Sequence, residues 1–384
     1  MRIVFAPDSF KGSLTSVEVA SALAAGWRRV RPGDEVRLTP LADGGEGTLD
    51  AIEAAGGWVR RRSPAHDPLG RPLEAAWLQS TDGERAVVEL AAASGISRLA
   101  RSERSPYAAT TFGTGELLVA AASAGVREIT LGIGGSATTD GGRGFVEALG
   151  GRVTGHPRDD PDWERIAVDL AGLDRRLGGV RLLVACDVDN PLLGERGAAA
   201  TYGPQKGAGP PDVPVLDARL AAWAEALEPA TGRRERATPG AGAAGGIGFA
   251  LLCLADRFGS FALRPGVELV MAATGFDAAL AGADLVVTGE GRIDAQTAFG
   301  KTAFGVARRA HDAGVACVAV GGGVEPEGAA ALAGLGAIAV PVHERPVPVE
   351  QAIAEGAAPL EACGSRLARS VDDAGLGGLA TIRW

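Results

Sequence analysis

Residues 1–30 read MRIVFAPDSFKGSLTSVEVASALAAGWRRV, and this stretch decides the fold. Residues 2–6 are a short β-branched and aromatic run, which predicts a strand. Apolar residues from Val19 to Val30 then recur at the spacing of one helical face. Thr15 and Glu18 form a capping box, because each side chain can accept from the other's backbone N–H. The loop after the strand is therefore aimed at a helix N-terminus.

The same order recurs along the chain. Alternating strands and helices predict a parallel sheet with crossover helices, whereas short alternating segments between residues 58 and 90 predict hairpins. We expect an α/β protein of two domains, a Rossmann-like domain with a parallel sheet (residues 1–60 and 284–384) and an inserted α/β domain that contains the hairpins (residues 61–283). Further strands are expected at residues 35–41, 128–131, 182–185, 284–288, 316–320 and 337–340, and helices at residues 48–55, 215–227, 244–255 and from the Ser105-Pro106 cap toward 124.

Composition excludes several classes of protein. The chain has 384 residues, of which 46% are hydrophobic, and its net charge is −9, so neither a disordered chain nor a nucleic-acid binder is expected. The apolar run near the N-terminus is too short for a signal peptide. No apolar run approaches the roughly 18 residues of a membrane span. We expect a cytoplasmic protein without a membrane partner.

Lysine is rare in this chain. Lys11, Lys206 and Lys301 are the only lysines among 38 basic residues, and each lies beside glycine in a polar segment. A compact ammonium group on a flexible stem differs from the planar fork of arginine. At least two of these lysines are expected to contact anions.

Five polar segments follow predicted strands, where ligands bind in open parallel sheets. Acidic groups, glycines and lysines that converge at one sheet edge suit phosphoryl transfer, which needs oxygen ligands for Mg²⁺, backbone donors for phosphate and cations for the developing charge. The glycine loop at residues 132–136 is the best phosphate cradle. The segments are Asp8 to Ser13, Asp43 to Glu46, Gly132 to Asp140, Asp187 to Asn190 and Gly289 to Asp294.

Two shorter motifs point elsewhere but are incomplete. Gly132-x-Gly134-x-x-Ala137 fits a dinucleotide fingerprint, but the acid expected at the end of the next strand is missing. Residues 295–302 resemble a loosened Walker A motif, yet several polar residues separate them from the preceding predicted strand. Neither a nicotinamide enzyme nor a P-loop fold is therefore expected.

The long motifs taken together resemble the class I glycerate kinase family. The match runs from residue 3 to about 325, in the family's order, and is carried by residues 6–13, 41–48, 134–138, 186–194, 202–208 and 288–294. The resemblance implies ATP-dependent, Mg²⁺-requiring phosphorylation of D-glycerate, most often on the 2-hydroxyl, on a two-domain fold with the active site between the domains. Thr139 stands where the family commonly has Asn.

Site roles follow as hypotheses. Arg292 can bind the substrate carboxylate bidentately, with Lys11 as a second candidate, and Asp189 is the favoured base for the hydroxyl proton. Asp187 or Asp189 could instead only cap the turn at Pro191. Metal candidates are Asp43, Glu290 and Asp187; Lys206 and Lys301 are expected to neutralise phosphate oxygens. Further candidates are Lys11 and Asp187 for catalysis, Ser13, Asn190, Asp8 and Asp294 for the substrate, and Gly132, Gly134, Gly135 and Ser136 for the nucleotide.

Alternatives stay open at this point. The product could be 3-phosphoglycerate, or the acceptor another small hydroxy acid. A metabolite-binding protein without turnover is a further alternative. The resemblance is compatible with a monomer or a homodimer.

Overall fold

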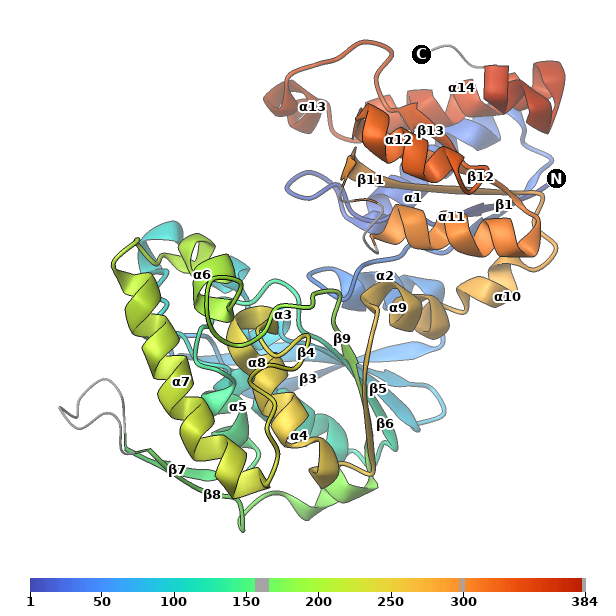
Figure 1. Cartoon of the computed structure of the whole chain (residues 1–384). Helices are drawn as coiled ribbons and strands as arrows, with labels where there is room; N and C mark the ends of the chain where they lie inside the picture. The colour runs from blue at the N-terminus through green and yellow to red at the C-terminus, as the bar shows by residue number, and fades with distance from the viewer. Residues whose placement is uncertain (156–165, 296, 298–300, 382–384) are drawn as a thin grey trace. The chain divides into compact units, whose positions relative to one another are not determined.

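The computed structural model of the chain describes residues 1–155, 166–295, 297 and 301–381 (Figure 1). The chain divides into two compact units, one of residues 1–43, 50–56 and 267–384 and one of residues 44–49 and 57–266. These limits differ from the expected 60/61 and 283/284. Residues 57–60 enter the strand that begins at Trp58 and pairs with residues of the second unit. Val267 packs beside Gly305 of the first unit.

The first unit contains a sheet with the strand order β13-β12-β11-β1-β2, in which neighbouring strands are parallel. Ile3 and Phe5 of β1 (Arg2–Phe5) point to one face, where they share a core with α1 (Ser16–Val30) and α14 (Ala358–Ala374). Because strand residues alternate between faces, Val4 points to the opposite face, and α11 (Thr302–Ala313) contacts β11 and β12. The expected Rossmann-like parallel sheet is confirmed.

The start of α1 matches the prediction in detail. Thr15 accepts from the backbone N–H of Glu18, and the Glu18 carboxylate accepts from the backbone N–H of Thr15 at 2.8 Å. Strand β11 (Leu285–Ile293), in contrast, continues five residues beyond the predicted end at Thr288. Its extension pairs with the glycine-rich end of β12 (Ala316–Val324), in register Glu290 to Gly321. The polar segment at residues 289–293 is therefore strand rather than loop.

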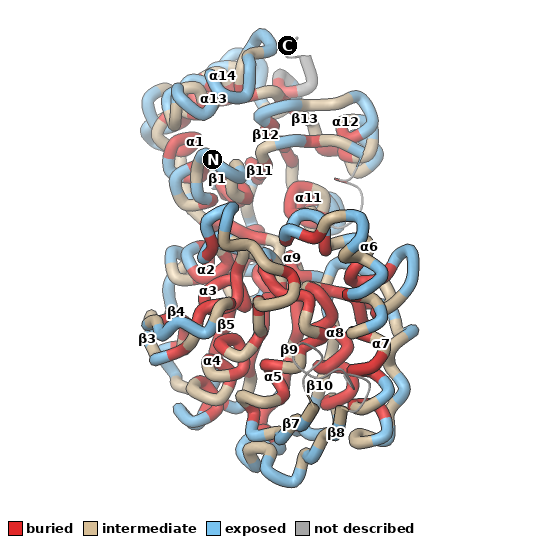
Figure 2. Tube along the Cα trace, turned by 90° about the vertical axis from the view of Figure 1, so that its left-hand side faces the viewer, coloured by how far each residue is buried: buried red, intermediate tan, exposed pale blue. Residues whose placement is uncertain are grey.

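The second unit contains a mixed sheet with the order β10-β9-β6-β5-β4-β3. Strands β10, β9, β6 and β5 are parallel to one another, and β4 (Pro72–Ser80) is antiparallel to β5. Strands β3 (Trp58–His66) and β4 form an antiparallel hairpin, as predicted. Asp67 closes the hairpin turn, because its carboxylate accepts from the backbone N–H of Leu69 and Arg71 at 2.8 and 2.9 Å. Strands β5, β6 and β9 are largely buried, as the trace at β5 and β9 in Figure 2 shows, whereas the edge strand β10 has no buried residue.

One predicted helix start is wrong. Ser105 and Pro106 begin a turn, in which Ala109 donates to the Ser105 carbonyl at 3.0 Å, and the helix α4 (Phe112–Ser123) starts later. Asp140 decides this start, because its Oδ2 accepts from the backbone N–H and the hydroxyl of Thr111 at 2.9 and 2.8 Å. A distant side chain thus replaces the local cap.

The remaining elements agree with the alternation of strands and helices. Across the described ranges, none of the helices combines the length and the apolar composition that crossing a membrane requires. The other elements are β2 (Glu35–Leu38), α2 (Thr48–Ala55), β5 (Arg85–Glu89), α3 (Ala91–Ser94), β6 (Glu128–Gly132), α5 (Arg143–Ala148), β7 (Arg152–Thr154), β8 (Ala167–Asp169), β9 (Arg181–Ala185), α6 (Ala198–Tyr202), α7 (Asp212–Thr231), α8 (Ala243–Cys253), β10 (Ser260–Arg264), α9 (Gly266–Thr274), α10 (Phe276–Leu280), α12 (Pro326–Ala333), β13 (Ile338–Pro341) and α13 (Val349–Glu355).

Candidate functional site

Two buried carboxylates lie at the carboxyl ends of β1 and β11. Asp8 follows β1, and its backbone N–H donates to the Gly289 carbonyl of β11 at 2.8 Å. Glu290 is the next residue of β11. Both residues are 8% exposed. The parallel pairing of β1 with β11 therefore brings two sequence segments, almost 300 residues apart, to one edge of the sheet, as expected for a ligand site.

Asp8 is held by short hydrogen bonds. Its carboxylate accepts from the Thr302 hydroxyl at 2.5 Å and from the backbone N–H of Ser9 at 2.6 Å. Burial, followed by the nearby Asp43 carboxylate, raises the pKa of Asp8 to about 6. The negative charge of Asp8 is thus only partly compensated by protein groups.

Glu290 has a similar environment. Its carboxylate accepts from the Thr297 hydroxyl at 3.1 Å and lies 3.6 Å from the Lys301 ammonium group. Burial nevertheless raises the pKa of Glu290 to about 7, because the cost of desolvating the charged form exceeds the attraction of Lys301. Lys301 also donates to Asp294 at 3.2 Å, so this predicted phosphate ligand joins two predicted acidic residues.

Lys11 and Arg292 are the more exposed cations of this unit. The Lys11 side chain is 80% exposed and lies 3.4 Å from Asp43, whose charge raises the pKa of Lys11. Arg292 pairs with Glu325 through both its Nε and its Nη2 atoms. Since the Arg292 side chain is 67% exposed, its guanidinium can exchange this partner for a ligand carboxylate. Ser13 lies on the same cavity as both cations.

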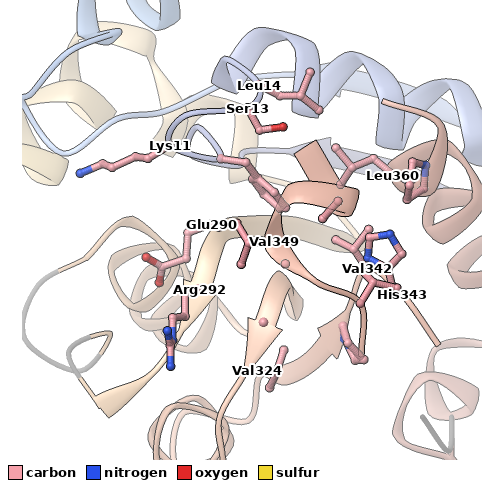
Figure 3. A pocket seen from close by; sticks show the side chains of 18 of the residues that line it. Lys11, Ser13, Leu14, Glu290, Arg292, Val324, Val342, His343, Val349 and Leu360 are labelled. Carbon is pink, nitrogen blue, oxygen red and sulfur yellow. The ribbon is translucent and has the colours of Figure 1, made fainter. Parts of the chain in front are cut away.

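That cavity has a volume of about 950 Å³ and lies entirely on the first unit. Lys11, Glu290 and Arg292 lie at one end, and Val342, His343 and Leu360 at the other (Figure 3). The structure thus brings together predicted residues from the N-terminal loop, β11 and α11. Predicted residues of this cavity are Asp8, Lys11, Ser13, Asp43, Glu290, Arg292 and Lys301.

The second unit carries the other predicted residues, among which Lys206 has an unexpected environment. Lys206 is 1% exposed, and its ammonium group donates to the Ser136 hydroxyl at 2.8 Å and to the Thr138 carbonyl at 2.6 Å. Burial lowers the pKa of Lys206 to about 7, against a smaller opposing effect of Asp140. In the structure Lys206 donates to oxygen atoms of the protein. The sequence did not predict that this lysine is buried.

The glycine loop at residues 132–136 also has a packing role. A Cβ atom on Gly132 would lie 2.5 Å from the Gly44 carbonyl oxygen, and one on Gly134 would lie 2.6 Å from the Gly45 Cα. The close approach of the backbone at residues 44–45 therefore accounts for both glycines without a ligand. Phosphate binding by Gly132, Gly134, Gly135 and Ser136 stays a prediction.

The segment after β9 contains three predicted residues with different partners. Asp187 accepts from the backbone N–H of Gly266 at 3.0 Å. Asp189 is 73% exposed and pairs with Arg196 at 2.9 Å, so its carboxylate is open to solvent. Asn190 donates to the Arg196 carbonyl at 2.7 Å and accepts from the Tyr202 hydroxyl at 2.7 Å, which holds the turn. Of the three, Asp189 is the most available to a ligand.

Several residues at the site escaped prediction. Thr302 and Thr297 orient Asp8 and Glu290, and neither hydroxyl was given that role from the sequence. Thr297 lies three residues beyond the motif at residues 288–294, and Thr302 ends the stretch that resembles a Walker A motif. The apolar end of the cavity comes from residues 339–360, which lie beyond the last of the six motifs that carried the resemblance. Residues 296 and 298–300 of the stretch that resembles a Walker A motif lie outside the described residues.

The carboxylates fit a magnesium ion. Within the described parts of the chain, no three His, Cys, Asp or Glu side chains converge into a preformed metal site. Mg²⁺, however, is usually held by one or two carboxylates together with substrate phosphates and waters. Asp8, Asp43 and Glu290 fit this chemistry, because burial and mutual repulsion raise the pKa of Asp8 and Glu290 in a way that a cation would offset.

Comparison with known proteins gives one consistent result. The glycerate kinase family matches residues 3–372. A protein named glycerate kinase from Halalkalibacterium halodurans is 46% identical over 326 residues, covering 83% of this chain and 85% of its own length. A protein named glycerate 2-kinase from Escherichia coli K12 is 42% identical over 318 residues, covering 80% and 81%.

A solved structure agrees with these relatives. The crystal structure of a protein assigned as glycerate kinase 2 from Salmonella typhimurium LT2 superposes with a TM-score of 0.82 at 39% identity, covering 97% of this chain and 98% of that one. The α/β fold expected from the sequence is thereby confirmed, and it is not a P-loop fold. The chain belongs to the glycerate kinase family.

Proposed function

We propose that this chain is an ATP-dependent glycerate kinase, which transfers the γ-phosphoryl group of ATP to the 2-hydroxyl of D-glycerate. The observation that carries the proposal is that Asp8 and Glu290 lie at one sheet edge, with Lys301 paired to Glu290, in a member of this family. Carboxylates for a cation and an ammonium group for phosphate oxygens are what phosphoryl transfer requires. The product is 2-phosphoglycerate, together with ADP.

Substrate binding falls to the exposed arginine of the cavity. Arg292 exchanges Glu325 for the carboxylate of glycerate, because its exposed guanidinium, which contacts one oxygen of Glu325, can bind a free carboxylate through both of its oxygens. Lys11 lies 3.4 Å from Asp43, so its ammonium group offsets the negative charge of that carboxylate. Lys11 also adds a second positive charge for the substrate anion, in the cavity that Arg292 lines. Ser13, Asp294 and Asn190 remain proposed contacts of the substrate hydroxyls.

The acceptor hydroxyl must lose its proton as the new phosphorus–oxygen bond forms and the bond to the ADP oxygen breaks. Asp189 takes this proton, because its carboxylate is exposed and its partner Arg196 is a surface residue. Asp187 fixes the same segment, because its carboxylate accepts a hydrogen bond from the backbone N–H of Gly266. This assignment requires the second unit to contribute to the site.

Mg²⁺ would be held by one or two of the carboxylates of Asp8, Asp43 and Glu290 together with phosphate oxygens, with Asp187 as a further candidate. When bound, the ion neutralises phosphate oxygens and orients the transferred group. Lys301 adds a positive charge beside Glu290. Lys206 acts as a positioning residue, since its ammonium group donates to Ser136 of the glycine loop and to the carbonyl of Thr138, just after the loop.

The proposal is tested by an ADP-release assay with D-glycerate, L-glycerate, tartronate and glycerol as acceptors. We expect Mg²⁺-dependent release with D-glycerate, and a product that phosphorus NMR identifies as 2-phosphoglycerate. A 3-phosphoglycerate signal would contradict the assignment of the hydroxyl. D-glycerate that raises Tm without ATP consumption would instead indicate a metabolite-binding protein.

A further inference from the structure

The cavity of the first unit joins two regions of opposite chemistry. At one end lie Asp8, Lys11, Glu290 and Lys301, all charged. The other end is walled by aliphatic side chains, of which Val342 and Leu360 lie on the side away from Lys11 and Arg292 in Figure 3. The aliphatic wall consists of Val342, Val347, Val349, Ile353 and Leu360.

Two residues of this wall are unusually exposed for their type. Val349 is 69% exposed and Ile353 is 44% exposed, and both belong to α13, a helix without a buried residue. Helix α13 is tied to the strand end before it, because Glu355 pairs with Nε2 of His343 at 2.8 Å. The apolar side chains of α13 are therefore held at the cavity while they contribute nothing to the core. Binding of a ligand that removes these apolar side chains from water would be favourable.

The reactants of the proposed kinase differ in what they ask of a binding site. Glycerate carries a carboxylate and two hydroxyls on three carbons, so it needs charges and hydrogen bonds and has little apolar surface. ATP combines a polyphosphate with a flat purine base. A cavity of about 950 Å³ is large enough for a nucleotide and far exceeds what glycerate fills.

We infer that the aliphatic wall binds the purine base of ATP, with the polyphosphate directed toward Lys301 and the acidic pair. This inference rests on the proposed kinase activity. It assigns a nucleotide subsite to residues 342–360, which none of the six motifs that carried the resemblance includes. The base is stacked between aliphatic side chains in place of water, so its binding depends on Val349 and Ile353.

The test measures ADP and inorganic tripolyphosphate binding to the full chain by calorimetry. Val349→Asn and Ile353→Asn are each expected to raise the Kd for ADP about tenfold, because the base loses an apolar contact. The Kd for tripolyphosphate and the KM for D-glycerate should stay within about twofold, since neither ligand has a base. Val215→Asn is the matched control, because Val215 is an exposed helical valine, 46% exposed, outside the cavity.

The outcomes separate the placement of the purine base from the kinase activity. An unchanged Kd for ADP in both cavity variants, or an equal loss of tripolyphosphate affinity, overturns the placement of the base while the kinase activity of the wild type stands. A wild type that releases no ADP with D-glycerate and binds neither ligand overturns the proposed function and the subsite with it.

A second measurement does not depend on the variants folding. Photolabelling of the wild type with 8-azido-ADP should modify residues between 339 and 360, as read by mass spectrometry of the digested protein. Labelling confined to other parts of the chain would overturn the inference.

Discussion

Lys206 should titrate near neutral pH, far below an ordinary lysine. It is 1% exposed, its ammonium group faces Ser136 and the Thr138 carbonyl, and burial lowers its pKa from 10.5 to about 7. The unfolded chain keeps the proton up to about pH 10.5. Between pH 7 and 10.5 the unfolded state therefore binds more protons, and the free energy of unfolding rises with pH.

The size of this effect follows from the two pKa values. For a single group whose pKa shifts from 10.5 to about 7 on folding, the free energy of unfolding rises by about 2 kcal/mol between pH 7 and pH 9. Buried thiols act in the opposite direction, because the pKa of Cys317 is raised to about 12. The prediction therefore concerns the difference in stability between the wild type and Lys206→Met, in which the thiol contributions cancel.

The chain is well suited to the measurement, because it contains only three lysines. Selective labelling of lysine Cε carbons gives three NMR signals, and Lys206→Met identifies one of them. That signal should have a midpoint near pH 7, and the stability difference from urea unfolding should rise by about 2 kcal/mol between pH 7 and 9. A Lys206 midpoint above pH 10, or a pH-independent difference in stability, would refute the reasoning that burial dominates.

Three further predictions follow from the site and the core. Asp189→Asn should lower kcat at least a hundredfold with little change in the KM for ATP, whereas an unchanged kcat removes Asp189 as the base. MgCl₂ should raise the Tm of the wild type but much less that of Glu290→Gln, with exposed Glu74→Gln as the control; equal rises in all three would exclude Glu290 as a ligand. Gly364→Ala should lower the free energy of unfolding by about 1–3 kcal/mol or more, because the added Cβ would lie 2.1 Å from the Leu23 carbonyl oxygen. Gly33→Ala, where the added Cβ meets open space, should match the wild type in urea unfolding.

The local prediction succeeded where neighbouring residues decide structure. The capping box of Thr15 and Glu18 formed as expected, because its partners are three residues apart. The turn at Asp67 closed the predicted hairpin for the same reason. Helix α4 shows the limit: its start depends on Asp140, almost thirty residues away, and no local pattern reports such a contact.

The site divides in the same way. Sequence by itself determined the residue types and their order. Motifs such as residues 6–13 and 288–294 identify the family and contain the site candidates Asp8, Glu290 and Arg292. Only the tertiary structure decided their environments. Burial shifts the pKa of Asp8 and Glu290 and withdraws Lys206 from solvent, and parallel pairing brings Thr302 to Asp8. These properties depend on desolvation and on contacts between distant segments, which residue spacing does not encode.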